Sequence, residues 1–285
     1  MTFKEKLQSK KFIITAELLP PKGIDISILL KKINHLEYID AVNVTDNQRA
    51  SMRASSIAIS KILIDNGVDP ILQIVTRDKN RIALQSDLLG ASILGIENLL
   101  LLSGDHTSIS EYYSAKAVYD LDTIQLIKTA RLLETGIDLV GNNLSGAPKF
   151  CVGAVINPSS TPQGLQVLMY KKKVLAGAEF FQTQAIFDIE LYKKFFKQVQ
   201  HLKVKILPGL ILIKSIRFMN FLKSLPGVKI PQCIQDRIEN AKDPLEEGKQ
   251  ICSQLIKELR NYADGVHIMA IGIEEHIPDI IKHSF

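Results

Sequence analysis

Three strand-like segments of this chain each run into a single polar residue whose side chain could do chemistry. They are Phe12–Ala16 before Glu17, Leu99–Gly104 before Asp105, and Glu179–Thr183 before Gln184. A carboxyl group so placed could serve as a general acid, and a carboxylate or amide can hydrogen-bond the edge of a heterocycle. Each residue taken alone also has a structural explanation, because polar groups at strand ends often cap backbone amides or form turns.

The elements around these residues form a repeating pattern of strand and helix. Short segments rich in Val, Ile, Leu or Phe, as expected of strands covered on both faces, alternate with amphipathic stretches. The predicted strands are Phe12–Ala16, Ala41–Thr45, Pro70–Val75, Asn98–Leu102, Phe150–Val155, Phe180–Thr183, Lys205–Leu210 and Gly265–Ala270. The predicted helices are Ser51–Asn66, Arg81–Leu94, Leu121–Thr135, Pro162–Ala176, Ile189–His201, Ser215–Leu225, Pro244–Tyr262 and Pro278–His283.

This alternation predicts a single (β/α)8 barrel over residues 1–285. Glycine directly follows four of the predicted helices, as helix-ending residues do, at Gly67, Gly95, Gly136 and Gly177. An open doubly wound sheet is the alternative, but it normally has a Gly-rich phosphate loop early in the chain, which this sequence lacks. In a barrel the carboxyl ends of all strands meet at one mouth. We therefore expect Glu17, Asp105 and Gln184 to share it.

Other polar residues near predicted strand ends allow a functional and a structural reading. The groups of Asn43–Asn47 and of Gln73–Asp78 could face the mouth or cap a following helix, and Asp78 in particular could be an N-cap. Lys173 could hold a phosphate or could simply be a solvated helix residue. His267 is expected to be a strand residue that is satisfied locally, and no role is assigned to it.

Composition excludes several classes of function. The net charge is +5 and the basic residues are scattered without interleaved aromatics, so we expect no nucleic-acid partner. The three cysteines form no CxxC pair, which argues against a metal site and suits a reducing compartment. The amino terminus does not resemble a signal peptide, and no apolar run approaches the roughly 18–20 residues that span a bilayer. We expect a cytoplasmic protein without membrane contact.

Taken in order, these segments resemble the methylenetetrahydrofolate reductase family of flavoproteins. The resemblance covers nearly the whole chain and lies in the motifs Thr15–Pro21, Ala41–Asp46, Leu102–Asp105, Lys173–Ala178, Thr183–Asp188 and Leu207–Leu210. Each motif is modest alone, but their order and spacing are specific. The stretch from Leu225-Pro226-Gly227-Val228 to Met269 is similar to the short bacterial and archaeal members, so no regulatory domain is expected.

The resemblance implies an activity and a set of site residues. It implies FAD at the carboxyl ends of the strands and reduction of 5,10-methylenetetrahydrofolate to 5-methyltetrahydrofolate, in one-carbon and methionine metabolism. Glu17 would be the general acid that assists ring opening, Asp105 would bind the pterin near the flavin, and Gln184 would contact folate. The positions that hold FAD in the family are Thr45, Asp46, Gln73, Ser103, Gly104, Asp105, Ala154, Asn157 and Lys173.

Several positions depart from the better-known bacterial pattern, mostly around the flavin and on the donor side. Gln73 and Asn157 replace histidines, Val155 replaces a tyrosine, Leu18 and Leu19 replace a Phe pair, and Ile216 replaces a phenylalanine. NADH or NADPH is the expected donor, with a redox partner subunit as an alternative. A pterin-binding barrel subunit that serves a larger redox or methyl-transfer complex, without using NADH directly, stays open as a second function. A homo-oligomer is also expected, and the substrate is folate or a related pterin.

Overall fold

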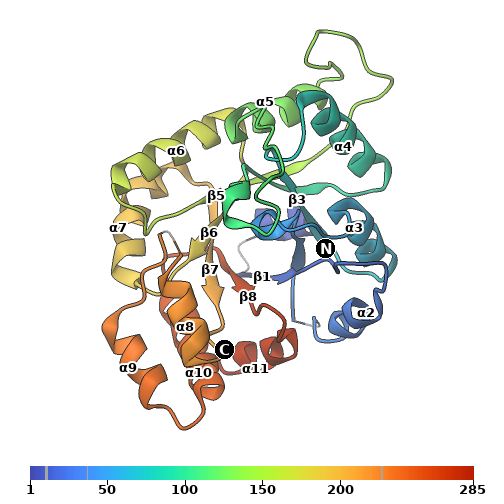
Figure 1. The fold of residues 1–285 in the computed structure, drawn as a ribbon. Helices are drawn as coiled ribbons and strands as arrows, with labels where there is room; N and C mark the ends of the chain where they lie inside the picture. The colour runs from blue at the N-terminus through green and yellow to red at the C-terminus, as the bar shows by residue number, and fades with distance from the viewer. Residues whose placement is uncertain (10–11, 37, 226) are drawn as a thin grey trace.

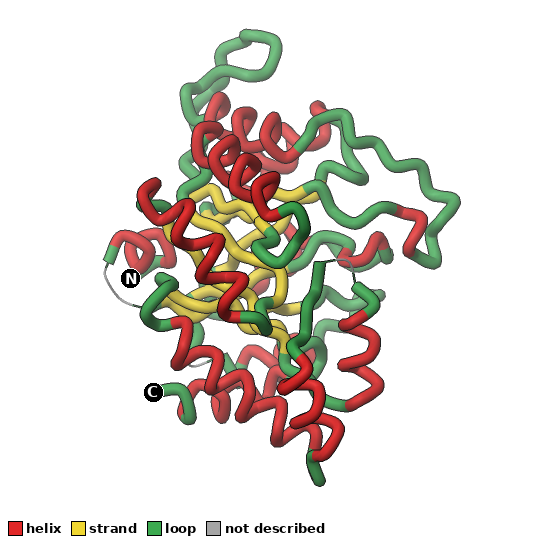
Figure 2. The backbone as a smooth tube through the Cα atoms, turned by 90° about the vertical axis from the view of Figure 1, so that its left-hand side faces the viewer, coloured by secondary structure: helices red, strands yellow, loops and turns green. Residues whose placement is uncertain are grey.

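The computed structural model describes residues 1–9, 12–36, 38–225 and 227–285. Parallel strands close into a barrel in which each strand pairs with the next along the chain and the eighth pairs with the first. The strands are β1 Ile13–Leu18, β2 Ala41–Val44, β3 Pro70–Val75, β4 Asn98–Leu102, β5 Cys151–Ile156, β6 Phe180–Ala185, β7 Lys205–Ile211 and β8 Gly265–Met269. This confirms the predicted (β/α)8 barrel, and Figures 1 and 2 show the helices surrounding the strands.

The helices form the outer layer of the barrel. They are α1 Phe3–Gln8, α2 Ser27–Ile33, α3 Ser56–Asp65, α4 Arg81–Ile93, α5 Thr123–Leu133, α6 Gln163–Ala176, α7 Ile189–Val199, α8 Ile216–Lys223, α9 Gln232–Asn240, α10 Pro244–Leu259 and α11 Ile277–Lys282. Short 3-10 turns are η1 Gln48–Ala50, η2 Thr107–Ile109, η3 Gln200–Leu202 and η4 Glu274–His276. Every predicted helix is present, whereas α1, α2 and α9 have no counterpart among the predictions.

Local sequence explains where these helices begin and end. The Asp122 side chain accepts from the amide of Gln125, and the Gln125 side chain accepts from the amide of Asp122, which forms a capping box at α5. Asp188 and Ser215 cap α7 and α8 in the simpler way, by accepting one backbone amide. The glycines predicted to end helices all take positive φ, which only glycine adopts freely: Gly67, Gly95, Gly136 and Gly177.

The amino-terminal half of the barrel interior is apolar. Helix α1 closes this end, with Phe3 fully buried and its ring packed edge-on against Phe180 at 5.1 Å between centroids. The cluster consists of Phe3, Leu7, Ile13, Ala41, Ile71, Leu100, Cys151, Phe180 and Leu207. A second, larger core lies between the outer faces of the strands and the helices. We call the first of these clusters the plug. It fills the amino-terminal end of the barrel, and polar groups lie toward the opposite end.

A polar layer lies directly above this plug. Alternate residues of a strand point to the same face, so Thr15 follows Ile13 into the interior and Glu17 comes next. The side chains of Asn43 and Gln182 exchange two hydrogen bonds across the barrel, at 2.6 and 2.9 Å. His267 Nδ1 lies 3.0 Å from Thr15 Oγ1, which confirms that the histidine is satisfied locally. These buried polar groups form the floor beneath the mouth.

The structure corrects some predicted boundaries. Glu17 and Gln184 lie inside β1 and β6, because pairing with the neighbouring strands continues to Leu18 and Ala185. The helix expected from Ser51 begins at Ser56 instead, since Ser51 and Ser55 have ψ angles of 132° and 128°, outside the helical range. Pro226, which belongs to one of the quoted motifs, lies outside the described residues.

Candidate active site

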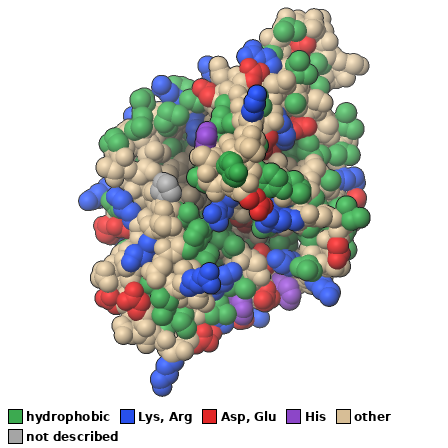
Figure 3. Space-filling view, in the orientation of Figure 1, with side chains coloured by type: hydrophobic (Ala, Val, Ile, Leu, Met, Phe, Trp, Pro, Cys, Tyr) green, Lys and Arg blue, Asp and Glu red, His purple; other side chains and the backbone are tan. Residues whose placement is uncertain are grey.

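A cavity of about 390 Å³ opens at the carboxyl ends of the strands, which is within the range of small-molecule sites. Its wall includes apolar side chains of four strands, namely Val75, Leu100, Leu102, Val155 and Met269. Basic and acidic side chains are scattered over the face of the molecule drawn in Figure 3 and form no stripe of one sign there. A cavity with apolar walls and a few polar groups suits a flat ligand with polar edges.

Most of the predicted site residues meet in this cavity. Those that line it are Glu17, Asp46, Gln73, Ser103, Gly104, Asp105, Asn157, Lys173 and Gln184. The structure thus brings Glu17 and Asp105, which are remote in sequence, to one cavity. Thr45 and Ala154 are not among the lining residues. Both are buried, and Ala154 packs in the core between strands and helices. The predicted cofactor contacts of these two residues stay predictions.

The carboxyl group of Glu17 lies between the amide of Gln48 and the imidazole of His267. Its Oε1 accepts a hydrogen bond from Gln48 Nε2 at 2.9 Å, and its Oε2 lies 3.9 Å from His267 Nε2. The Glu17 side chain is 11% exposed. It is therefore accessible from the cavity and fixed in direction, as a group that transfers a proton to a bound molecule must be.

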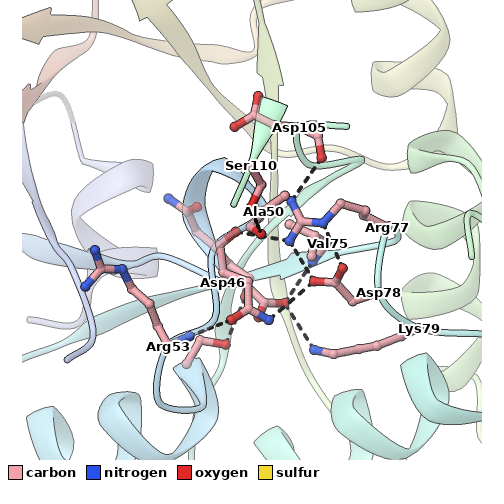
Figure 4. A network of polar contacts seen from close by, with 12 residues as sticks. Asp46, Ala50, Arg53, Val75, Arg77, Asp78, Lys79, Asp105 and Ser110 are labelled. Atoms are coloured by element: carbon pink, nitrogen blue, oxygen red, sulfur yellow. Dashed lines mark hydrogen bonds and ion pairs between the residues drawn. The ribbon is translucent and has the colours of Figure 1, made fainter. Parts of the chain in front are cut away.

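The position of Asp105 depends on a buried arginine. Arg77 is 1% exposed, and its Nη1 donates to the backbone carbonyl of Asp105 at 3.1 Å. Its other donors bind both carboxylate oxygens of Asp78 and the carbonyl of Asn47. Figure 4 shows the guanidinium group at the centre of this network. Arg77 thus joins the loops that follow β2, β3 and β4.

Ion pairs hold the other acidic groups around the mouth. Burial opposes the charge on Asp78, but the hydrogen bond and charge of Arg77 prevail and lower the pKa of its carboxyl group. Asp78 is therefore not the N-cap that the sequence allowed, and Asn80 caps α4 instead. Asp46 accepts from the amide of Val75 and from Lys79 Nζ, both at 3.1 Å. These carboxylates are structural anchors.

Lys173 lines the cavity and has a backbone carbonyl, not a carboxylate, as its hydrogen-bond partner. Its Nζ donates to the carbonyl of Val155 at 2.7 Å, and no ion pair involves it within the described residues. Burial lowers the pKa of the Lys173 amine to about 8, against a smaller opposing effect of Asp122. The amine is still mostly protonated at neutral pH. A partly buried cation with no acidic partner is suited to bind an anionic ligand group.

Several lining residues were outside the sequence-based predictions or had no role there. They are Gln48, Arg49, Arg77, Thr123, Gln166, Gln182, His267 and Met269. A period-two pattern could have found Gln182 and His267, since each lies two residues before another lining residue of its strand. No comparable sequence signal exists for Gln48 or Arg49, which lie in an irregular loop.

Comparison with known proteins bears on what this cavity does. A family model described as methylenetetrahydrofolate reductase matches residues 2–284. The chain belongs to this family. It is 25% identical to a probable methylenetetrahydrofolate reductase (NADPH) of Caenorhabditis elegans, over 97% of this chain and 42% of that protein. It is 24% identical to a 5,10-methylenetetrahydrofolate reductase of Buchnera aphidicola, over 89% of this chain and 84% of that protein.

The reductase family includes proteins much longer than this chain. The chain spans 42% and 40% of the length of two eukaryotic relatives. Among solved structures, it is similar to a Clostridium thermocellum protein described as binding two copies of 5-methyl-5,6,7,8-tetrahydrofolic acid. The TM-score is 0.68 with 17% identity, covering 100% of this chain and 98% of that one. At this identity the likeness shows a shared fold.

Two further features of the described residues concern metals and membranes. No group of three or more His, Cys, Asp or Glu side chains in this part of the chain is arranged to hold a metal ion. No helix within the described ranges has both the length and the apolarity needed to cross a membrane.

Proposed function

We propose that this chain reduces 5,10-methylenetetrahydrofolate to 5-methyltetrahydrofolate with FAD as its cofactor. The observation that carries the proposal is the meeting of Glu17 and Asp105 in one cavity at the mouth of the barrel. Membership of the reductase family supports the same reaction. The Buchnera relative, of which this chain covers 84%, is named for it.

The residues of the cavity fit a flavin dinucleotide. Lys173 offers a positive charge with no carboxylate partner in the described structure, as a diphosphate requires. The apolar walls suit the faces of an isoalloxazine ring. When bound, the flavin would supply the hydride.

The protein side of the reaction is proton transfer and orientation. Glu17 would protonate the ring amine of the substrate, so that the five-membered ring opens to an iminium ion. Asp105 would accept hydrogen bonds from the N–H groups of the pterin and fix its face toward the cofactor. Gln184, which lines the same cavity, would bind folate through its amide.

The electron donor proposed is a reduced nicotinamide. Relatives of this chain are named as NADPH-dependent and as NADH-dependent enzymes, so both nucleotides belong in the assay. Some residues expected near the electron donor differ from the better-known bacterial pattern. A redox partner subunit is therefore the alternative donor. Absence of NADH and NADPH oxidation by the flavin-loaded chain, together with an iron–sulfur protein that co-purifies with it, would favour that alternative. The homo-oligomer and the cytoplasmic location stay predictions.

A second candidate function is folate binding without a flavin. It is favoured by the Clostridium thermocellum protein, whose description names two methyltetrahydrofolate molecules and no flavin. Under this hypothesis the cavity would hold a pterin for a methyl-transfer or redox complex. A colourless protein that binds methyltetrahydrofolate but takes up no FAD would support it.

Replacement of Glu17 by glutamine tests the proposed reaction. The holoprotein is reduced anaerobically, and its reoxidation by methylenetetrahydrofolate is followed by flavin absorbance. We expect Glu17→Gln to reduce this reoxidation to a small residual rate while FAD stays bound, because the amide cannot donate the required proton. Glu239→Gln, at an exposed residue of α9, is the matched control and should react like the wild type. A Glu17→Gln protein that is reoxidised at the wild-type rate would contradict the assigned role.

A further inference from the structure

We propose that Gln48 is a positioning residue that orients Glu17 for proton transfer. Gln48 lies in the loop between β2 and α3, outside every motif that carries the family resemblance. Its Nε2 donates to Glu17 Oε1 at 2.9 Å, and both side chains line the cavity. The inference rests on the proposed function, because it assigns to Gln48 a role in the reaction attributed to Glu17.

The hydrogen bond makes the two oxygens of Glu17 inequivalent. An amide N–H is a donor and occupies a lone pair of Oε1. The transferable proton of the carboxylic acid therefore belongs on Oε2. That oxygen faces His267, whose Nε2 is 3.9 Å away. Because the other ring nitrogen of His267 is engaged by Thr15, the imidazole has a fixed orientation. Gln48 and His267 together decide which oxygen of Glu17 carries the proton.

The backbone around Gln48 is strained in a way that this role would explain. Asn47, Arg49 and Ala50 have φ angles of 45°, 57° and 55°, in the left-handed region that residues other than glycine rarely adopt. Such strain persists only where the surroundings enforce it, and it is concentrated at functional sites. Here the unusual path of the chain places the Gln48 amide against Glu17 while Arg49 lies over the ring of Phe221 in α8.

Side chains from two neighbouring segments, and one hydrogen bond within the loop itself, hold this loop in place. Arg77 Nη2 donates to the carbonyl of Asn47 at 3.0 Å, and Ser110 Oγ donates to the carbonyl of Ala50 at 2.6 Å. The amide of Arg53 donates to Asn47 Oδ1 at 3.0 Å. Figure 4 shows these contacts around the same guanidinium group that binds the carbonyl of Asp105. The Arg77 guanidinium therefore fixes both the Gln48 loop and the backbone of Asp105.

A double-mutant cycle between Gln48 and Glu17 tests the proposal. Gln48→Met keeps the length of the side chain but removes the amide. In the reduced holoprotein we expect reoxidation by methylenetetrahydrofolate to slow about tenfold or more, the usual effect of losing a hydrogen bond to an ionisable group. The substrate concentration for half-maximal rate should change little. In the Glu17→Gln background, followed over long times, Gln48→Met should cause no further loss, since the acid that it orients is gone.

Control variants separate this role from a structural one. Gln85→Met removes an amide whose hydrogen bonds, to Arg81 and Leu139, lie outside the cavity, and it should keep the wild-type rate. Gln48→Asn leaves a polar side chain in the loop that is too short to reach Glu17, so it should be as slow as Gln48→Met. It replaces Gln48→Met in the cycle if that variant binds no FAD.

Three outcomes would overturn the inference or its premise. Equal losses in the wild-type and Glu17→Gln backgrounds would mean that Gln48 only supports the loop. A wild-type rate in Gln48→Met and Gln48→Asn would remove its role altogether. If Glu17→Gln alone leaves reoxidation unchanged, the proposed function fails first, which is distinguishable from a failure confined to Gln48.

Discussion

The acidic residues in and around the mouth of the barrel differ in the kind of partner that each one has. Asp78 binds the guanidinium of Arg77, and Asp46 binds the ammonium of Lys79. A carboxylate paired with a cation favours its charged form and is poorly suited to carry a proton. Glu17 instead receives a neutral amide from Gln48. Compared with Asp46 and Asp78, Glu17 is therefore the best placed of the three to carry a proton, which supports its assignment as the acid.

The pKa of Lys173, about 8 because of burial, predicts a pH dependence of flavin binding. The amine is charged below that pH and neutral above it, while a bound phosphate favours the charged form. The affinity of the apoprotein for FAD should therefore fall, by up to about tenfold per unit of pH, as the pH rises from about 8 to about 9. Titration of the apoprotein followed by flavin fluorescence measures this.

Two substitutions at the same position complete that experiment. Lys173→Arg keeps its charge throughout this range, so its affinity for FAD should not vary with pH. Lys173→Met should bind FAD weakly at every pH. An unchanged pH dependence in Lys173→Met would show that another group is responsible and would remove Lys173 from the cofactor site.

Some site residues could be predicted from sequence because they follow recognisable strands. Glu17, Asp105 and Gln184 belong to this group, since an apolar run leads into each of them. Arg77 could not be recognised, because its almost complete burial depends on three loops that meet only in the folded chain. The role of His267 was equally hidden, because it depends on the register that places it opposite Thr15.

At the scale of elements, the strands were predicted more accurately than the helices. The strands are short and rich in Val, Ile, Leu or Phe, as is typical of a buried parallel sheet, although β6 also contains three successive polar residues. Helix α9 was not predicted because its apolar positions are sparse. Its buried hydrophobic residues are Ile234 and Ile238. The start of α3 was misplaced because residues 51–55 contain neither glycine nor proline, so no sequence signal marks the non-helical backbone at Ser51 and Ser55.

The packing of α10 against the end of β7 gives a prediction about stability. A Cβ atom at Gly248 would lie 2.0 Å from the carbonyl oxygen of Ile213, whereas one at Gly90 in α4 would meet nothing within 4 Å. Gly248→Ala should lower the free energy of unfolding by about 2 kcal/mol or more. Gly90→Ala should raise it by about 0.5–1 kcal/mol, because alanine is the better helix former. Urea unfolding followed by circular dichroism compares them, and equal stability of the two variants would contradict this packing.

At the scale of the whole molecule, the barrel has a closed end and an open end. Helix α1 fills the closed end with Phe3 and Leu7, and the polar layer of Thr15, Asn43 and Gln182 separates it from the cavity. Stability and chemistry are therefore assigned to opposite ends, as is usual for this fold. We propose that residues 1–285 form one folding domain on this basis.

This division predicts that a substitution in the plug lowers stability without changing flavin affinity or the reaction rate. Phe3→Ala removes a fully buried ring and should lower the free energy of unfolding by about 3–5 kcal/mol. At temperatures where the variant is folded, its flavin affinity and rate should match the wild type. Phe285→Ala, at a ring that is 60% exposed, should cost much less. A Phe3→Ala protein that is fully stable, or folded but inactive, would argue against the division.

The absorbance spectrum of the purified protein under anaerobic conditions tests the central claim most directly. The account predicts that the protein carries the yellow absorbance of oxidised flavin, or gains it on reconstitution with FAD, and that 5-methyltetrahydrofolate bleaches it by running the reaction in reverse. A protein that stays colourless after incubation with FAD, or whose flavin is untouched by the methylated folate, would contradict a cavity in which Glu17 and Asp105 serve pterin reduction.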